Sequence, residues 1–195
     1  MLGDNRWQAY YRALYGVAIA LGESQLEPDA VLKQLLQGVI EALRLKAASI
    51  RLLSKEGRLE PAAGEGLSQQ YREKGPVDVE HSGVDREALA GRPVIILDVS
   101  ADPRFEYPEE ARREGIVSAI FVPLIARGEP IGVLRAYTGE RRTFIPDEME
   151  LLVALASLGA LAIVNARLYQ VCVLDQQMTA EALWSFHLPD ELLGR

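Results

Sequence analysis

The chain has 195 residues, of which 49% are hydrophobic and 25% are charged, and its net charge at pH 7 is −7. This composition is typical of a globular protein with one domain of ordinary size, and the negative charge argues against nucleic-acid binding, which needs a basic surface. One cysteine and two histidines exclude an internal disulfide and leave too few ligands for a Cys- or His-based metal centre.

Two amphipathic helices are expected first. Apolar residues recur at helical spacing over residues 4–21 and again over 28–43, where Pro28 suits the first helical turn. Asp4 and Arg6 stand where a signal peptide would need an apolar core. We therefore expect a cytoplasmic protein.

The middle of the chain alternates strands with polar segments. Strands are expected over residues 48–54, 59–63 and 94–98, and short helices over 68–74, 82–90 and 108–114. Residues 117–138 indicate a β-hairpin, with two apolar arms joined by a turn at 126–130 in which Gly128 supplies a positive φ. Because both arms are nearly continuously apolar, this hairpin is expected to be central in a sheet covered on both faces.

The longest helix begins at Pro146 and meets its first firm stop at Pro189. A helix of this length exceeds what one small domain covers, so its second half is expected to pack against another chain. Its uncharged apolar run, residues 151–164, is too short to span a bilayer, and no membrane contact is expected. The order of elements predicts an α+β fold, an antiparallel sheet with the terminal helices bundled on one face.

Several stretches together resemble the GAF domain family over residues 25–170. They are GRPVIILD at 91–98, DPRF at 102–105, SAIFVPL at 118–124, GEPIGVL at 128–134 and the helical segment 144–169. The resemblance implies a GAF/PAS-like central antiparallel sheet of about five or six strands, N- and C-terminal helices on one face, and a pocket covered by loops and short helices on the other. It also implies a sensory or regulatory role, often as a homodimer through parallel terminal helices. Ile145 departs from the family, which usually has a Thr or Ser cap before the last helix.

The resemblance divides the chain into three parts. Residues 1–24 are expected to form an N-terminal amphipathic helix, residues 25–170 the GAF-like domain, and residues 171–195 a C-terminal helical extension for signalling or dimerisation. Nothing after Pro189 resembles an output domain. We therefore expect either a missing output domain or a separate signalling partner.

Strand geometry predicts which residues face the pocket. If alternate residues of the first strand face the terminal helices, Ser49 and Arg51 face the pocket, and in the last strand Val133, Arg135 and Tyr137 do the same. The first and last strands are central neighbours in the resembled sheet, so Arg51 and Arg135 are expected side by side. Two such guanidinium groups favour an anionic small molecule, a carboxylate or a phosphate. The full candidate pocket set is Ser49, Arg51, Asp98, Phe105, Tyr107, Ser118, Val133, Arg135 and Tyr137.

Three readings of function remain open. The first is a non-catalytic sensory domain that binds a small molecule, and the second is a structural dimerisation module whose pocket is collapsed. Packed Phe105 and Tyr107 would favour the second reading. The alternative to an anionic ligand is that Asp98 or a Glu of the middle segment pairs with the arginines, or that this face is open to water. The third, less favoured, is a cyclic-nucleotide-binding domain.

An enzyme is not expected, and neither is a cofactor. The sequence has no G-x-S-x-G elbow and no Gly-rich phosphate loop after a strand. One thiol cannot both form and resolve an oxidised intermediate. Cys172 lies late in the last helix, beyond the sheet, where a bilin-attachment role does not fit.

Overall fold

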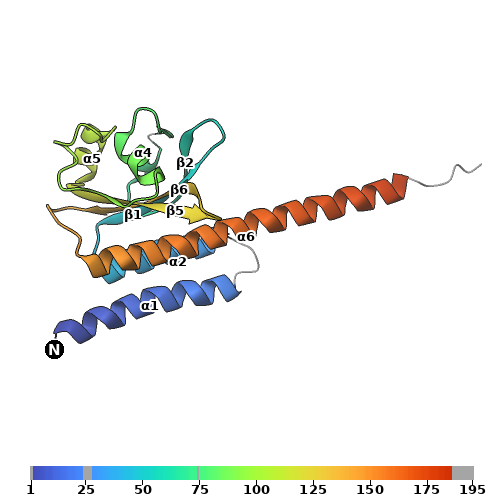
Figure 1. Ribbon diagram of the computed structural model, residues 1–195, viewed down its shortest axis with the longest axis horizontal. Coiled ribbons are helices and arrows are strands. Elements are labelled where there is room, and N and C mark those ends of the chain that lie inside the picture. The colour runs from blue at the N-terminus through green and yellow to red at the C-terminus, as the bar shows by residue number, and fades with distance from the viewer. Residues whose placement is uncertain (1, 24–27, 74, 186–195) are drawn as a thin grey trace, which may run out of the picture.

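The computed structural model describes residues 2–23, 28–73 and 75–185, which form one antiparallel sheet with helices on both faces (Figure 1). The elements in chain order are α1 (Leu2–Glu23), α2 (Pro28–Leu43), β1 (Ala47–Leu53), β2 (Arg58–Glu65), α3 (Gln69–Arg72), β3 (Val77–Asp78), α4 (Gly83–Leu89), β4 (Val94–Ile96), α5 (Pro108–Glu114), β5 (Ser118–Ala126), β6 (Glu129–Thr138) and α6 (Pro146–Ser185). Each helix and strand expected from the sequence is present. The strand β3 is additional, because two residues carry no periodic signal. Pro189, the expected stop of the last helix, lies outside the described residues.

The described strands form a six-stranded sheet in the order β3-β2-β1-β6-β5-β4, and each neighbouring pair is antiparallel. This confirms the expected α+β class and places β1 and β6 at the centre of the sheet. The strands β5 and β6 form the expected hairpin. Its turn has Arg127 at φ 53° and Gly128 at φ 84°. Two positive φ values in a two-residue loop are typical of a type I′ turn, whose twist matches that of the flanking strands.

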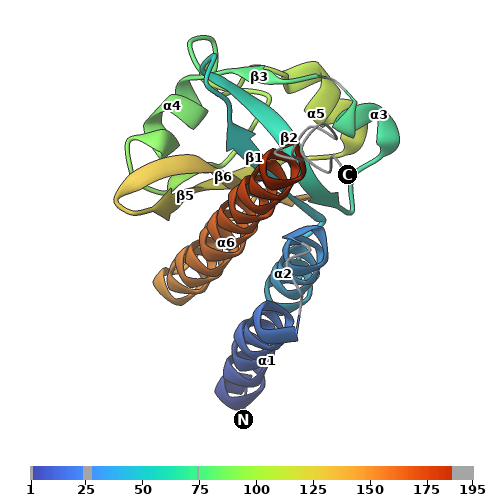
Figure 2. The same cartoon turned by 90° about the vertical axis from the view of Figure 1, so that its right-hand side faces the viewer.

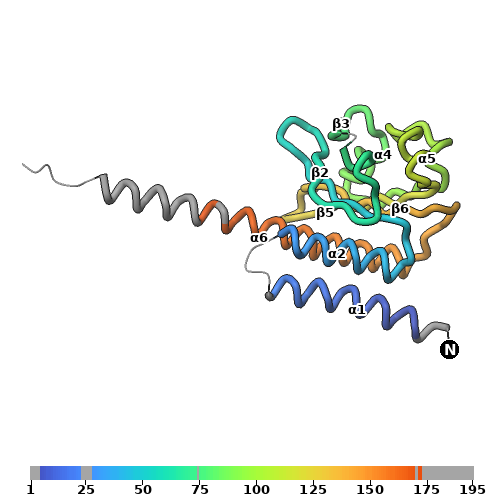
Figure 3. The backbone as a smooth tube through the Cα atoms, turned by 180° about the vertical axis from the view of Figure 1, so that it is seen from behind, coloured from blue at the N-terminus to red at the C-terminus, as the bar shows by residue number. Residues whose placement is uncertain are grey.

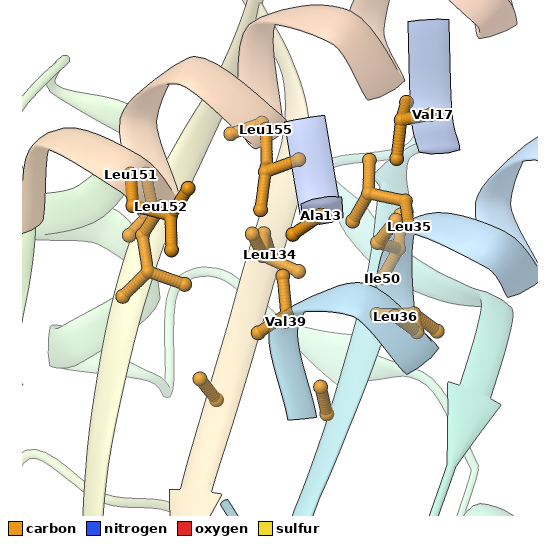
Figure 4. Close-up of a cluster of buried hydrophobic side chains, with 14 of the residues drawn as sticks. Ala13, Val17, Leu35, Leu36, Val39, Ile50, Leu134, Leu151, Leu152 and Leu155 are labelled. Atoms are coloured by element: carbon orange, nitrogen blue, oxygen red, sulfur yellow. The ribbon is translucent and has the colours of Figure 1, made fainter. Parts of the chain in front are cut away.

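One face of the sheet is covered by α2 and α6, and α1 lies on the outer side of α2 (Figures 1 and 2). Apolar residues of α2 recur at helical spacing and are buried, which explains why this helix lies flat on the sheet. Figure 4 shows side chains from three helices and two central strands meeting in one cluster: Ala13, Val17, Leu35, Leu36, Val39, Ile50, Leu134, Leu151, Leu152 and Leu155. Full burial of each Leu or Ile contributes roughly 1.5–3 kcal/mol, so this cluster is a principal source of stability.

The opposite face carries the short helices α3, α4 and α5 over a second buried cluster. Val133 and Tyr137 of β6 and Phe121 of β5 belong to this second cluster. Leu134 and Ala136 of β6 belong to the first. Successive residues of β6 therefore point to opposite faces, as strand geometry requires, and the predicted faces of this strand are confirmed.

The helix α6 starts without a hydroxyl cap, because Ile145 precedes Pro146. The carboxylate of Glu148 compensates by accepting a hydrogen bond from the Ile145 N–H at 3.1 Å, and it also accepts one from the guanidinium of Arg142. This is half of a capping box, in which a residue of the first turn reaches back to the cap position. Glu148, a residue of the helix itself, therefore supplies the hydrogen bond at the start of α6 where the family usually has a Thr or Ser cap.

The N-terminal part of α6 is also the most apolar segment of the chain. The stretch Pro146–Tyr169 is long and apolar enough to cross a membrane by length and composition alone, although the run 151–164 within it is too short. Half of its most apolar window is buried inside the protein, where α6 packs on β5 and α2. Farther along, α6 extends well beyond the sheet (Figures 1 and 3).

Candidate ligand-binding site

A cavity of about 220 Å³ lies between the central strands and α3, on the face of the sheet opposite α6. Its lining residues come from β1, β2, β6 and the α3 region: Ser49, Ile50, Arg51, Pro61, Ala62, Ala63, Gly64, Leu67, Tyr71, Arg72 and Tyr137. Arginine is the only charged residue type in this lining, and no Asp or Glu contributes to it.

A β-bulge shapes one wall of the cavity. In the β1–β2 pair Ile50 is opposite Ala63, but Arg51 is opposite Pro61, so Ala62 has no partner. An extra residue bends its strand, and Pro61 is tolerated because β3 pairs with β2 only at Arg58 and Leu59. The bulged segment Pro61, Ala62 and Ala63 lines the cavity beside Arg51.

Arg51 is the buried charge of this cavity, with 4% of its surface exposed. Its Nη1 donates to the carbonyl oxygens of Leu59 and Gly75, each at 2.9 Å. Among the described residues, no carboxylate lies within ion-pair distance of Arg51. Burial, and then the positive charge of Arg135, lower the pKa of Arg51, but an arginine remains protonated at neutral pH. The cavity therefore borders a buried cation without a counter-ion.

Arg135 lies on the same face of the neighbouring strand, and its charge is neutralised within the protein. Its Nη2 is 2.8 Å from Oδ1 of Asp85, and both side chains are 3% exposed. Burial is the largest single influence and lowers the pKa of Arg135, but Asp85, Tyr137 and Tyr71 together raise it more, so the pKa lies above its ordinary value. The guanidinium also lies over the ring of Phe121, 5.5 Å from its centroid. The expectation that Asp98 or a Glu pairs with the arginines is therefore wrong, because the partner of Arg135 is Asp85.

Asp85 is held in place by the start of α4. Ser82 caps this helix, and its hydroxyl donates to Oδ2 of Asp85 at 2.6 Å. Val84 and Ala88 on the same helix are fully buried in the second cluster. In the sequence, Ser82 followed three residues later by Asp85 is a capping-box pattern. This pattern predicts the start of a helix, but it does not predict that Asp85 pairs with Arg135.

Three of the predicted pocket residues line the cavity: Ser49, Arg51 and Tyr137. The hydroxyls of Ser49 and Tyr137 are 3.3 Å apart and share a hydrogen bond. These residues come from the two central strands, whose pairing in the sheet brings them together. Val133 and Arg135 are on the same face of β6 but do not line the cavity.

Phe105 and Tyr107 cover a different part of this face. Both are packed against the second buried cluster, and the ring of Phe105 meets Phe121 edge-on at 6.3 Å between centroids. The Tyr107 hydroxyl donates to the Pro76 carbonyl at 3.4 Å. The sheet above β5 and β6 is thus closed by aromatic packing, and the open space lies over β1 and β2.

Asp98 and Ser118 lie outside the cavity and have structural bonds. Oδ1 of Asp98 accepts hydrogen bonds from the Ser100 hydroxyl at 2.6 Å and its N–H at 3.0 Å, and these bonds lower the pKa of Asp98. The Ser118 hydroxyl donates to the Leu97 carbonyl at 2.7 Å and accepts from the Arg142 N–H at 2.9 Å. Ser118 thereby joins β5 to the segments at its base.

Sequence reasoning missed the residues that α3 contributes. Tyr71 is 4% exposed, and burial raises its pKa. Arg72 follows it and lines the cavity with its long side chain. A helix of one turn has no periodicity to reveal which of its residues face inward, so only the packed structure identifies them. In the part of the chain that the structure describes, no group of three His, Cys, Asp or Glu residues is arranged to hold a metal ion.

The antiparallel sheet, with long helices on one face and short helices and a small cavity on the other, defines a domain of the α+β class. The chain belongs to the GAF domain family, whose model matches residues 25–164. A search of curated proteins finds none that matches the chain.

Several solved structures, a GAF domain among them, resemble this fold. The GAF domain of a phosphoenolpyruvate-protein phosphotransferase from Coxiella burnetii has a TM-score of 0.74 at 21% identity, covering 84% of this chain and 98% of that one. A domain of a putative two-component sensor histidine kinase from Sinorhizobium meliloti has a TM-score of 0.60 at 26% identity, covering 70% and 90%. Free methionine-R-sulfoxide reductase from Neisseria meningitidis has a TM-score of 0.67 at 22% identity, covering 82% and 91%. At these identities the likeness to the first and third shows the fold alone.

Proposed function

We propose that this chain is a non-catalytic sensory domain of the cytoplasm that binds a small anionic molecule in the cavity beside Arg51. It would relay binding through α6, as a homodimer, to a signalling partner or an output domain. The observation that carries the proposal is a buried arginine that has no carboxylate of the described residues within ion-pair distance, next to a cavity with no acidic residue in its lining.

The electrostatics of Arg51 favour an anion as the occupant. A buried cation is costly unless it is paired, and the two carbonyl oxygens that Arg51 contacts compensate only part of that cost. A carboxylate or phosphate in the cavity would add charge-assisted hydrogen bonds. The cavity volume, about 220 Å³, is below the roughly 300–1,000 Å³ of sites for drug-sized ligands, which favours a small metabolite over a cyclic nucleotide.

The position of the site suggests how binding would reach α6. Ser49 and Arg51 line the cavity, while Ile50, between them in β1, belongs to the cluster shared with α2 and α6. A shift of β1 on binding would therefore change the packing under α6. In a densely packed core such shifts are transmitted, because side chains have no free space to absorb them.

The structural dimerisation module keeps one observation in its favour. The sheet above β5 and β6 is closed by Phe105 and Tyr107, and Arg135 already has Asp85 as its partner. If the cavity beside Arg51 binds nothing, this whole face of the sheet has a structural role only.

The Arg51→Gln variant tests the proposed function. We expect small carboxylates or inorganic phosphate to raise the melting temperature of the unaltered chain, and we expect the variant to bind them about tenfold to hundredfold more weakly, because charge-assisted hydrogen bonds are lost. Calorimetric titration measures the affinities, and circular dichroism checks the fold. Arg113→Gln, an exposed position on α5 outside the cavity, is the matched control. Binding that is absent in all proteins, or equal in both variants, would overturn the anion site.

We place the proposed dimer contact on the solvent-facing side of α6. Two interleaved rows repeat every seven residues, Ala154, Leu161 and Leu168 in one and Ser157, Val164 and Val171 in the other. Leu161 is 49% exposed, Leu168 47% and Val171 65%, although all three are apolar. A seven-residue apolar repeat is typical of a coiled-coil seam, which supports a parallel pairing of α6 between two copies.

Two negative charges introduced into this seam by substitution are expected to dissociate the dimer. The double variant Leu161→Glu, Leu168→Glu should run as a monomer in light scattering, because like charges at facing positions repel and the apolar contact is lost. Leu97→Glu, an exposed apolar position near β4, is the control and should remain dimeric. In a Cys172→Ser background, Val171→Cys should form an intermolecular disulfide if the helices are parallel and in register. A monomeric unaltered chain would contradict the dimer.

A further inference from the structure

A second arginine borders the same cavity at its outer end. Arg72, the last residue of α3, is exposed overall, but its stem lies against the bulged strand. A Cβ added to Gly64 would be 3.4 Å from Cδ of Arg72 and 3.8 Å from Cγ. Among the described residues, Arg72 has no carboxylate within ion-pair distance.

The position of Arg72 is set by its helix and does not depend on a ligand. At the start of α3, the N–H and the hydroxyl of Ser68 both donate to the carboxylate of Glu114 on α5, at 2.8 and 2.5 Å. Tyr71 is buried, and its ring meets Tyr137 edge-on at 6.1 Å between centroids. The short helix is thus held at both its cap and its buried side, and Arg72 is presented at the mouth of the cavity.

The charges around the cavity therefore have a definite arrangement. Arg135 is neutralised by Asp85 and lies outside the lining. Arg51 is buried at the inner end, and Arg72 is exposed at the outer end. The other lining residues include the apolar Pro61, Ala62, Ala63 and Leu67, together with the hydroxyl-bearing Ser49, Tyr71 and Tyr137. Neither Arg51 nor Arg72 has a carboxylate of the described residues within ion-pair distance, and both line one cavity that has no acidic residue in its lining. Two such cations favour a ligand with two negative groups.

We propose that the ligand is a small dianion with two separate anionic groups joined by a short apolar stem, as in a short-chain dicarboxylate. One anionic group would pair with Arg51 and the other with Arg72, while the stem lies along the bulged strand. This proposal rests on the proposed function, since it names the ligand class of the same cavity. A volume of about 220 Å³ limits the stem to a few carbon atoms.

Matched pairs of probes test the ligand class on the full chain. Succinate is compared with butyrate, and glutarate with valerate, by calorimetric titration at fixed ionic strength. We expect each dicarboxylate to bind roughly fivefold more tightly than its monocarboxylate, because Arg72 is exposed and its ion pair is screened by water. In Arg72→Gln this preference should vanish while monocarboxylate binding is unchanged. In Arg51→Gln both probes should bind weakly, and Arg113→Gln should behave like the unaltered chain.

The outcomes separate this proposal from the one on which it rests. If no probe binds, the anionic sensory function itself fails. If both members of each pair bind equally, or if Arg72→Gln keeps the preference, the anion site stands and the dianion is overturned. Inorganic phosphate is the remaining probe: tighter binding of phosphate than of succinate would show that one compact anion fills the site, and would also overturn the dianion.

Discussion

Replacing Asp85 by alanine is expected to lower the free energy of unfolding by about 3–5 kcal/mol. Arg135 would keep its charge in an environment where only 3% of its side chain is exposed, with no carboxylate at 2.8 Å to balance it. The hydroxyl of Ser82 would also lose its acceptor at the start of α4. The large cost comes from the uncompensated buried charge, because a lost surface ion pair costs about 1 kcal/mol or less.

Urea denaturation monitored by circular dichroism measures this effect. Glu87→Ala on the same helix is the control, because Glu87 pairs with Arg104 in an exposed ion pair at 2.9 Å and its loss should cost less than about 1 kcal/mol. The double variant Asp85→Leu, Arg135→Met removes both charges and is expected to be nearly as stable as the unaltered chain. A cost below about 1 kcal/mol for Asp85→Ala would contradict the buried ion pair.

Replacing Gly132 by alanine is expected to cost about 3 kcal/mol, an overpacking effect at the upper end of the usual range. Gly132 in β6 is opposite Leu52 of β1, and a Cβ at this position would lie 2.3 Å from the carbonyl oxygen of Arg51. The nearest atoms are backbone, so the strain cannot be relieved by turning a side chain. The strand β1 would have to move away, and Arg51 would move with it.

The Gly132→Ala variant should therefore lose both stability and anion affinity. Thermal unfolding measures the stability, and calorimetric titration with butyrate measures the anion affinity. Gly22→Ala in α1 is the control, because a Cβ there meets nothing within 4 Å and alanine favours a helix by about 1 kcal/mol. The close approach of β1 and β6 would be refuted if the two alanine variants were equally stable.

The limits of sequence reasoning are clearest for the pocket residues. Ser49, Arg51 and Tyr137 were predicted to face the pocket and do line the cavity, because strand alternation follows directly from chain geometry. Asp98 was predicted to line the pocket with them, but it lies outside the cavity, where it accepts hydrogen bonds from Ser100. A local turn of this kind depends on side-chain geometry that hydrophobic periodicity does not report.

The sequence by itself determined the helices, the hairpin, the α+β class and the side of the sheet on which Arg51 lies, since these depend on periods of 3.6 and 2 along the chain. Only the tertiary structure decided that Asp85 neutralises Arg135 and that Arg72 reaches the cavity. The first contact joins α4 to the distant strand β6, and the second joins α3 to β2, which directly precedes it in the chain. Their physical basis is the packing of α3 and α4 onto the sheet, which brings together charges that no local pattern relates.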